Sequence, residues 1–209
     1  MGARFRQLIL LCSVAALLSL HAGAAPRTIL FFGDSLTAGH GLDNPNAEAF
    51  PALIQKKIAD AHLSWRVVNA GLSGETTAGG LRRVDWVLQQ SVDIFVLALG
   101  GNDGLRGIEP AVSRQNLQGI IDRVRAKYPA AKIVLAGMQM PPELGEGYVR
   151  DFDAVYPALA AKNNLTLVPF LLAGVGGVPE LNQRDGIHPT AAGHAIVADN
   201  VWKILRPLL

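Results

Sequence analysis

The chain has 209 residues, of which 50% are apolar and 17% are charged, and its formal net charge is +2. This length predicts one domain with a substantial buried core. The composition excludes a disordered or low-complexity chain.

The first 24 residues predict a secretory signal peptide. Arg4 and Arg6 precede an apolar run over residues 8–20, and Ala22-Gly23-Ala24 matches the small-x-small pattern of a cleavage site. The run is too short to indicate a membrane span. We therefore expect cleavage after Ala24 and an exported protein, in the periplasm or the medium, without a stable membrane anchor.

Cleavage changes both the charge and the cysteine content. Without Arg4 and Arg6 the mature chain carries 17 basic and 17 acidic residues, so its formal net charge is zero. A neutral chain gives no indication of nucleic-acid binding. Cys12, the single cysteine, is also removed, which leaves neither a disulfide nor a cysteine nucleophile.

Residues 25–209 alternate between strand-like and helix-like segments. Short apolar runs predict strands at 29–32, 65–69, 93–99, 132–137 and 165–170. Amphipathic stretches predict helices at 47–62, 77–90, 112–128, 148–163 and 190–205. This alternation predicts a single α/β domain, a three-layer α/β/α sandwich with a five-stranded parallel sheet.

The first predicted strand ends at Gly33-Asp34-Ser35. Loops at the carboxyl ends of parallel strands gather catalytic side chains, so Ser35 stands where a serine nucleophile would. The same three residues are also an ordinary turn and helix N-cap sequence.

The second predicted strand is followed by a glycine-containing turn. Gly71 and Gly74 both permit the close backbone approach that an oxyanion-binding N–H needs. The turn also reads as a strand-to-helix connection with an N-cap threonine. Ser73 is a rival nucleophile, but the elbow sequence G-x-S-x-G fails because Glu75 occupies the last position.

The third predicted strand leads into Gly100-Gly101-Asn102-Asp103. The Asn102 carboxamide at this sheet edge is a suitable oxyanion donor, although asparagine also favours left-handed turns. Near the end, Asp185 precedes His188 by three residues, which supplies a base and the carboxylate that orients it. His194 is expected to be structural, because it is not at the i, i+4 metal-ligand spacing.

These four segments together resemble the SGNH (GDSL) hydrolase superfamily. The sequence LGGNDGLRG at 99–107 is especially similar to its bacterial periplasmic thioesterase/arylesterase/lysophospholipase branch. The resemblance implies Ser35 as nucleophile, His188 as base and Asp185 as the residue that orients the base. It also implies an oxyanion hole made by the Ser35 and Gly74 backbone N–H groups and the Asn102 side chain. Gly74 is chosen over Gly71 because an acidic residue and threonine follow it, and Asp34 is expected to be structural.

The resemblance further implies a flavodoxin-like strand order of 2-1-3-4-5 and hydrolysis of small-molecule esters or thioesters through an acyl-enzyme on Ser35. No cofactor is implied, and no metal motif such as H-E-x-x-H occurs. We expect a monomer. A carbohydrate O-acetylesterase would use the same residues and remains an alternative, as does a non-catalytic exported binding protein. A nucleotide binder is disfavoured because residues 174–179 do not match G-x-G-x-x-G.

Two loops at the same sheet edge are candidates for substrate binding. The first, residues 104–108, offers Leu105 and Ile108, with glycines that would let it close over an acyl chain. The second, residues 138–147, offers Met140 and other apolar side chains as the opposite wall. These loops also read as ordinary surface connections.

Overall fold

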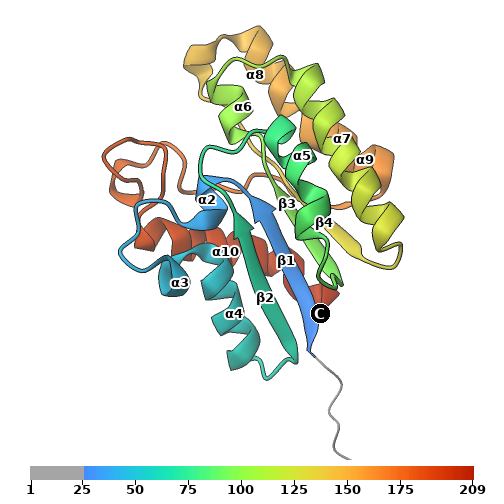
Figure 1. Cartoon of the computed structure of the whole chain (residues 1–209). Helices are drawn as coiled ribbons and strands as arrows, with labels where there is room; N and C mark the ends of the chain where they lie inside the picture. The colour runs from blue at the N-terminus through green and yellow to red at the C-terminus, as the bar shows by residue number, and fades with distance from the viewer. Residues whose placement is uncertain (1–25) are drawn as a thin grey trace, which may run out of the picture.

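The computed structural model describes residues 26–209, and the predicted signal peptide at 1–24 lies outside them. All strand pairs are parallel, and the strand order is β2-β1-β3-β4-β5, which confirms the predicted sheet (Figure 1). The strands are β1 (Arg27–Gly33), β2 (Trp65–Gly71), β3 (Ile94–Ala98), β4 (Lys132–Ala136) and β5 (Thr166–Val168).

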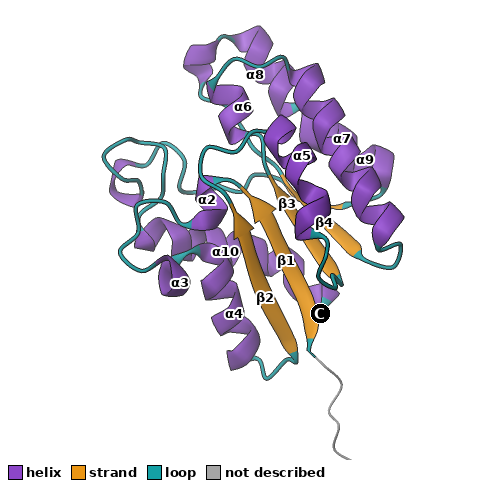
Figure 2. Cartoon of the chain, viewed as in Figure 1, coloured by secondary structure: helices purple, strands orange, loops and turns teal. Residues whose placement is uncertain are grey.

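Helices cover both faces of this sheet, as Figure 2 shows. One layer contains α4 and α10, which pack against each other, and the other contains α5, α7 and α9. The helices are α2 (Ser35–Ala38), α3 (Pro45–Glu48), α4 (Phe50–Asp60), α5 (Thr77–Val87), α6 (Gly101–Leu105), α7 (Pro110–Lys127), α8 (Glu146–Asp153), α9 (Val155–Asn163) and α10 (Ala191–Leu205). No helix among residues 26–209 is long and apolar enough to cross a membrane.

The interior strand β1, between β2 and β3, is buried on both faces, which explains its uninterrupted apolar sequence. Side chains alternate between faces along a strand. Phe31 therefore meets Phe50 of α4, with ring centroids 5.5 Å apart, while Phe32 lies against Arg83 of α5 on the opposite side. This packing fixes the strand whose carboxyl end carries Ser35.

Two predicted long helices are each broken in two. The segment 47–62 divides into α3 and α4, and 148–163 divides into α8 and α9. The backbone is extended at Ala49, just before Pro51, and α8 ends just before Pro157. Proline lacks the N–H that a continuous helix needs, but it is tolerated in the first turn of a new one.

The last strand is shorter than predicted. The segment 165–170 forms a strand only over Thr166–Val168, because Pro169 cannot donate to a strand ladder. The structure also adds two short helices that the sequence reading did not expect, α2 and α6. Each starts at the carboxyl end of a central strand and carries one candidate site residue, Ser35 on α2 and Asn102 on α6.

Candidate active site

Ser35 is the first residue of α2 and follows β1 through a single residue, Asp34. The Asp34 carboxylate caps α2 by accepting a hydrogen bond from the Leu36 N–H at 3.0 Å. A larger residue would not fit in place of Gly33, because its Cβ would collide with the Thr37 hydroxyl and the Ala98 carbonyl oxygen. These contacts hold the serine in one place at the sheet edge.

Burial raises the pKa of Asp34 to about 6, although the hydrogen bond from the Leu36 N–H opposes this shift. The Asp34 side chain makes no hydrogen bond to His188. Its capping bond accords with the structural role expected for it.

The structure brings Ser35 and His188 together across 153 positions of the chain. The Ser35 Oγ lies 2.9 Å from His188 Nε2, and His188 Nδ1 lies 2.7 Å from Asp185 Oδ2. The other Asp185 oxygen accepts from the backbone N–H groups of Ile187 and His188 at 2.9 and 3.0 Å. The side-chain hydrogen bond from His188, with these two backbone bonds, lowers the pKa of Asp185 to about 2. The three side chains therefore form one continuous hydrogen-bonded chain.

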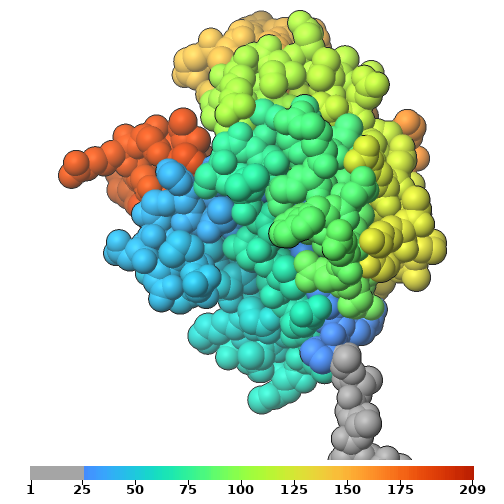
Figure 3. All heavy atoms as spheres, in the orientation of Figure 1, coloured from blue at the N-terminus to red at the C-terminus, as the bar shows by residue number. Residues whose placement is uncertain are grey.

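The loop that carries His188 is attached to the nucleophile segment by Gln183. The Gln183 side-chain amide donates to the His40 carbonyl at 2.7 Å, and the Gln183 N–H donates to the His188 carbonyl at 2.7 Å. The His40 ring also lies against the His188 ring, with centroids 4.7 Å apart. Figure 3 shows this orange-red segment beside the blue segment that follows Ser35.

The candidate oxyanion donors converge from three strand ends. Asn102 Nδ2 donates to the Glu75 carbonyl at 3.0 Å, which leaves its second amide hydrogen without an acceptor among residues 26–209. Within the same residues the backbone N–H groups of Ser35 and Gly74 also have no acceptor. Gly74 has a φ of +80°, which favours glycine.

The two candidate glycines differ in what their N–H groups do. The Gly71 N–H donates to Asn69 Oδ1 at 2.9 Å, and a Cβ at Gly71 would collide with the backbone of Ala38. Gly71 therefore serves the packing of α2 on β2. The Gly74 N–H is free to bind a ligand.

A buried carboxylate that the sequence did not indicate joins the segment of Asn102 to the segment of Gly74. Asp103 is fully buried and accepts hydrogen bonds from the Thr77 N–H at 2.8 Å, the Thr77 hydroxyl and the Ser113 hydroxyl at 3.2 Å. It thereby ties the residue after Asn102 to the start of α5. No local sequence pattern indicated this pairing, because Asp103 and Thr77 lie on different helices.

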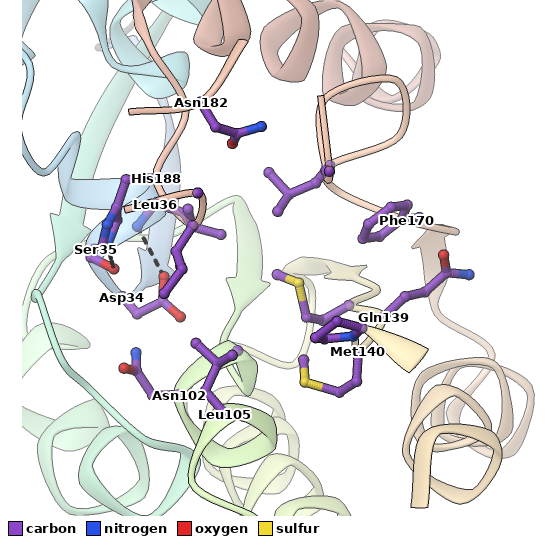
Figure 4. Close-up of a pocket in the computed structure, with 18 of the residues that line it drawn as sticks. Asp34, Ser35, Leu36, Asn102, Leu105, Gln139, Met140, Phe170, Asn182 and His188 are labelled. Atoms are coloured by element: carbon purple, nitrogen blue, oxygen red, sulfur yellow. Dashed lines mark hydrogen bonds between the residues drawn. The ribbon is translucent and has the colours of Figure 1, made fainter. Parts of the chain in front are cut away.

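A cavity of about 540 Å³ opens beside Ser35. In Figure 4, Ser35, His188 and Asn102 lie at one end, and Met140 and Phe170 lie at the other. Four apolar side chains that follow β4 and β5 line this cavity, namely Met138, Met140, Phe170 and Leu172. Nothing in the sequence indicated that Phe170 and Leu172 line the cavity.

The structure corrects one predicted substrate contact and the predicted mobile loop. Leu105 and Met140 line the cavity, but Ile108 does not. The Ile108 carbonyl accepts a hydrogen bond from Tyr148 Oη at 2.8 Å. Residues 101–105 are helix α6, and Gly104 is pressed against the Met140 side chain. The structure therefore gives Gly104 no freedom to act as a hinge.

His194 lies on α10 and is buried, with Nδ1 accepting from the Phe50 N–H at 3.2 Å. Burial, with a smaller effect of His188, lowers its pKa to about 4. Among residues 26–209 no group of three or more His, Cys, Asp or Glu side chains is arranged to hold a metal ion.

A parallel sheet of this order, with Ser, His and Asp joined at its carboxyl edge and Gly74 and Asn102 beside them, defines a hydrolase of the SGNH class. The sequence model of the GDSL-like lipase/acylhydrolase family matches residues 31–196. The chain therefore belongs to this family of hydrolases, which confirms the resemblance inferred from its four motifs.

Known proteins with related sequences are esterases and thioesterases. The chain is 46% identical over 202 residues to the esterase TesA of Pseudomonas aeruginosa, covering 96% of this chain and 98% of that protein. It is 38% identical over 198 residues to the thioesterase 1/protease 1/lysophospholipase L1 of Escherichia coli K12, covering 92% and 89%. A crystal structure of TesA superposes with a TM-score of 0.83 at 46% identity, covering 88% of this chain and all of that chain.

Proposed function

We propose that the protein hydrolyses acyl esters and thioesters through an acyl-enzyme on Ser35. The observation that carries this proposal is the unbroken hydrogen-bonded chain from Ser35 Oγ through His188 to Asp185 at the mouth of an apolar cavity. A serine hydroxyl becomes nucleophilic when an oriented base takes its proton.

Each of the three side chains has a defined part in the proposed reaction. Ser35 Oγ attacks the acyl carbonyl carbon while His188 Nε2 takes the hydroxyl proton. His188 then gives this proton to the departing alcohol or thiol. In the second half of the reaction, His188 takes a proton from water, which attacks the acyl carbonyl carbon. The bond to Ser35 Oγ then breaks, the acid leaves, and His188 returns the proton to Ser35 Oγ. Asp185 holds the Nδ1 proton and stabilises the imidazolium, which fits its lowered pKa.

The tetrahedral oxygen would bind in the space bordered by three donors. These are the backbone N–H groups of Ser35 and Gly74 and the free amide hydrogen of Asn102. Donors held in place before the reaction stabilise the developing negative charge without reorganisation. The bond from Asn102 to the Glu75 carbonyl fixes the direction of the third donor.

The cavity favours an acyl chain over an acetyl group. Its lining includes the apolar side chains of Met138, Met140, Phe170 and Leu172, and Met140 and Phe170 lie at the end away from Ser35 (Figure 4). Each buried CH₂ contributes up to ~0.8 kcal/mol, so a chain of several carbons gains binding energy that acetate cannot. This favours an arylesterase, thioesterase or lysophospholipase activity over the alternative, a carbohydrate O-acetylesterase. We further propose that the protein acts as an exported monomer.

The test replaces Ser35 by Ala and measures hydrolysis of p-nitrophenyl hexanoate and hexanoyl-CoA. Loss of the nucleophile should lower kcat by about 10⁴-fold or more with the fold intact by circular dichroism. The control is Ser73→Ala, which removes the rival serine from an exposed turn and should retain full activity. Near-normal turnover by Ser35→Ala would end the proposal.

A further inference from the structure

A buried ion pair lies directly behind the proposed oxyanion hole. Arg83 of α5 donates to Glu75 Oε2 through Nε at 2.7 Å and also through Nη2. The Glu75 side chain is 5% exposed and the Arg83 side chain is 19% exposed. Both charges are therefore largely removed from water.

Arg83 contacts two strand ends as well as Glu75. Its Nη2 donates to the Ala70 carbonyl at 3.0 Å, near the end of β2. Its guanidinium carbon lies 4.4 Å from the ring centre of Phe32, near the end of β1. One planar group thus links the strand that leads to Ser35, the strand that leads to Gly74, and the turn between β2 and α5.

Glu75 is the residue through which this contact reaches the reaction centre. Its N–H belongs to the peptide that follows Gly74, and its carbonyl oxygen accepts the hydrogen bond from Asn102 Nδ2 at 3.0 Å. A displacement of Glu75 would therefore move the Gly74 N–H and rotate the Asn102 amide together.

Stability alone does not explain such a pair. Removing two charges from water costs about as much free energy as their attraction returns, so a buried ion pair adds little net stability. It does impose geometry, because the rigid guanidinium fork accepts only a narrow set of partner positions.

We propose that Arg83 is a positioning residue for the oxyanion hole, acting through Glu75 on Gly74 and Asn102. This rests on the proposed ester hydrolysis by Ser35. Arg83 does not touch the substrate, and its guanidinium holds the Glu75 peptide so that two donors meet the developing oxyanion. Small displacements of such donors have large effects on rate, because they stabilise the transition state more than the bound substrate.

The test is Arg83→Met, assayed with p-nitrophenyl hexanoate. We expect kcat to fall about 10- to 100-fold while KM changes less than about twofold, since the donors act mainly in the transition state. The matched control is Arg82→Met, the same change at the neighbouring, exposed position of α5, which should leave both constants unchanged. Arg83→Lys keeps a charge near Glu75 without the planar fork, so its kcat should lie between wild type and Arg83→Met.

A second measurement asks whether Arg83 acts through Asn102. In an Asn102→Ala background, Arg83→Met should lower kcat by a much smaller factor than it does in the wild-type background. The fold-loss of kcat in the double variant should therefore be smaller than the product of the two single fold-losses. Equal losses in both backgrounds would overturn the proposal, as would an unchanged kcat in Arg83→Met or a loss confined to KM. Should Arg83→Met fail to fold, Arg83→Lys answers the same question.

Ser35→Ala in the same assay distinguishes a failure of the positioning role of Arg83 from a failure of the proposed ester hydrolysis. If Ser35→Ala is inactive and Arg83→Met retains full kcat, only the positioning role is wrong. If Ser35→Ala retains activity, the proposed function is wrong and the positioning role falls with it.

Discussion

Gly74 and Asn102 each precede a buried, hydrogen-bonded carboxylate, whereas Asp185 and His188 belong to a largely exposed loop. Around the first pair, the carboxylates of Glu75 and Asp103 are buried and bound by side chains or backbone N–H groups from neighbouring helices. The Asp185 side chain, in contrast, is 42% exposed. Its two backbone hydrogen bonds come from its own loop.

The two parts of the site are therefore held in place in different ways. On the proposed oxyanion side, bonds to the buried carboxylates of Glu75 and Asp103 hold the surrounding segments, so we expect the donors to need no rearrangement during the reaction. The loop with Asp185 and His188 is held by a few contacts, chiefly the hydrogen bond from Gln183 to the His40 carbonyl in the nucleophile segment. We therefore expect substitutions on the two sides to differ in size and kind.

The largest effect should come from His188→Ala. Because His188 Nε2 is the one hydrogen-bond partner of the Ser35 hydroxyl among residues 26–209, kcat should fall about 10⁴-fold or more. Asp185→Asn should cost less, about 10²-fold, because it removes a group that only orients and stabilises the base. Steady-state kinetics on one ester compares the two variants. An Asp185→Asn loss as large as that of His188→Ala would contradict the assigned roles.

Asn102→Ala should come next. It deletes one oxyanion donor, which lowers kcat by about 10²- to 10³-fold with little change in KM. The control is Asn116→Ala, which removes an amide from the nearby network at Thr77 without touching the cavity. A KM effect that exceeds the kcat effect would place Asn102 in substrate binding instead.

His194, on the helix that follows the Asp185–His188 loop, makes the free energy of unfolding of the protein depend on pH. Its pKa is about 4 in the folded protein and near 6.5 when unfolded, so the unfolded chain takes up a proton first as the pH falls. Its contribution is fully present above about pH 6.5 and is lost towards pH 4, by about 3 kcal/mol.

His194→Asn keeps an acceptor for the Phe50 N–H and removes the titration. Urea unfolding at pH 7 and pH 4 should show the variant gaining about 3 kcal/mol relative to wild type on acidification. A difference between the two proteins that stays constant with pH would contradict this.

The smallest effect concerns chain length. For wild type, kcat/KM should rise from acetyl towards hexanoyl or octanoyl esters as the chain reaches Met140 and Phe170. Met140→Ala should lower the ratio of kcat/KM for the long-chain ester to kcat/KM for the acetyl ester about fivefold to tenfold, while kcat/KM for the acetyl ester changes little. The control is Leu144→Ala, because Leu144 is in the same connection but does not line the cavity. A wild-type preference for acetyl would favour the O-acetylesterase.

The alternating pattern predicted a parallel sheet, because strand and helix patterns are local signals. The strand order and the grouping of Ser35 with Asp185 and His188 came from the resemblance to the SGNH hydrolases. The pattern did not predict where helices break, since Pro51 and Pro157 fit a long amphipathic pattern until the missing N–H is considered. A tertiary contact also overrode the reading of residues 104–108 as a mobile loop. Gly104 packs on Met140, which is distant in sequence.

The contacts that support the site were the least predictable. Glu75 with Arg83, and Asp103 with Thr77, are pairings across elements that no local pattern encodes. Gln183 looks like an ordinary loop residue in sequence, and only the fold brings its amide to the His40 carbonyl. The candidate site residues were predicted from motifs, whereas the residues that hold them in place could be identified only from the structure.

Covalent trapping of the nucleophile tests the central claim most directly. The protein is incubated with diethyl p-nitrophenyl phosphate, digested and mapped by mass spectrometry. The account predicts stoichiometric release of p-nitrophenol, loss of esterase activity, and one diethylphosphoryl adduct on Ser35 that is absent in Ser35→Ala. An adduct on Ser73 or another residue that accompanies full inactivation would contradict it.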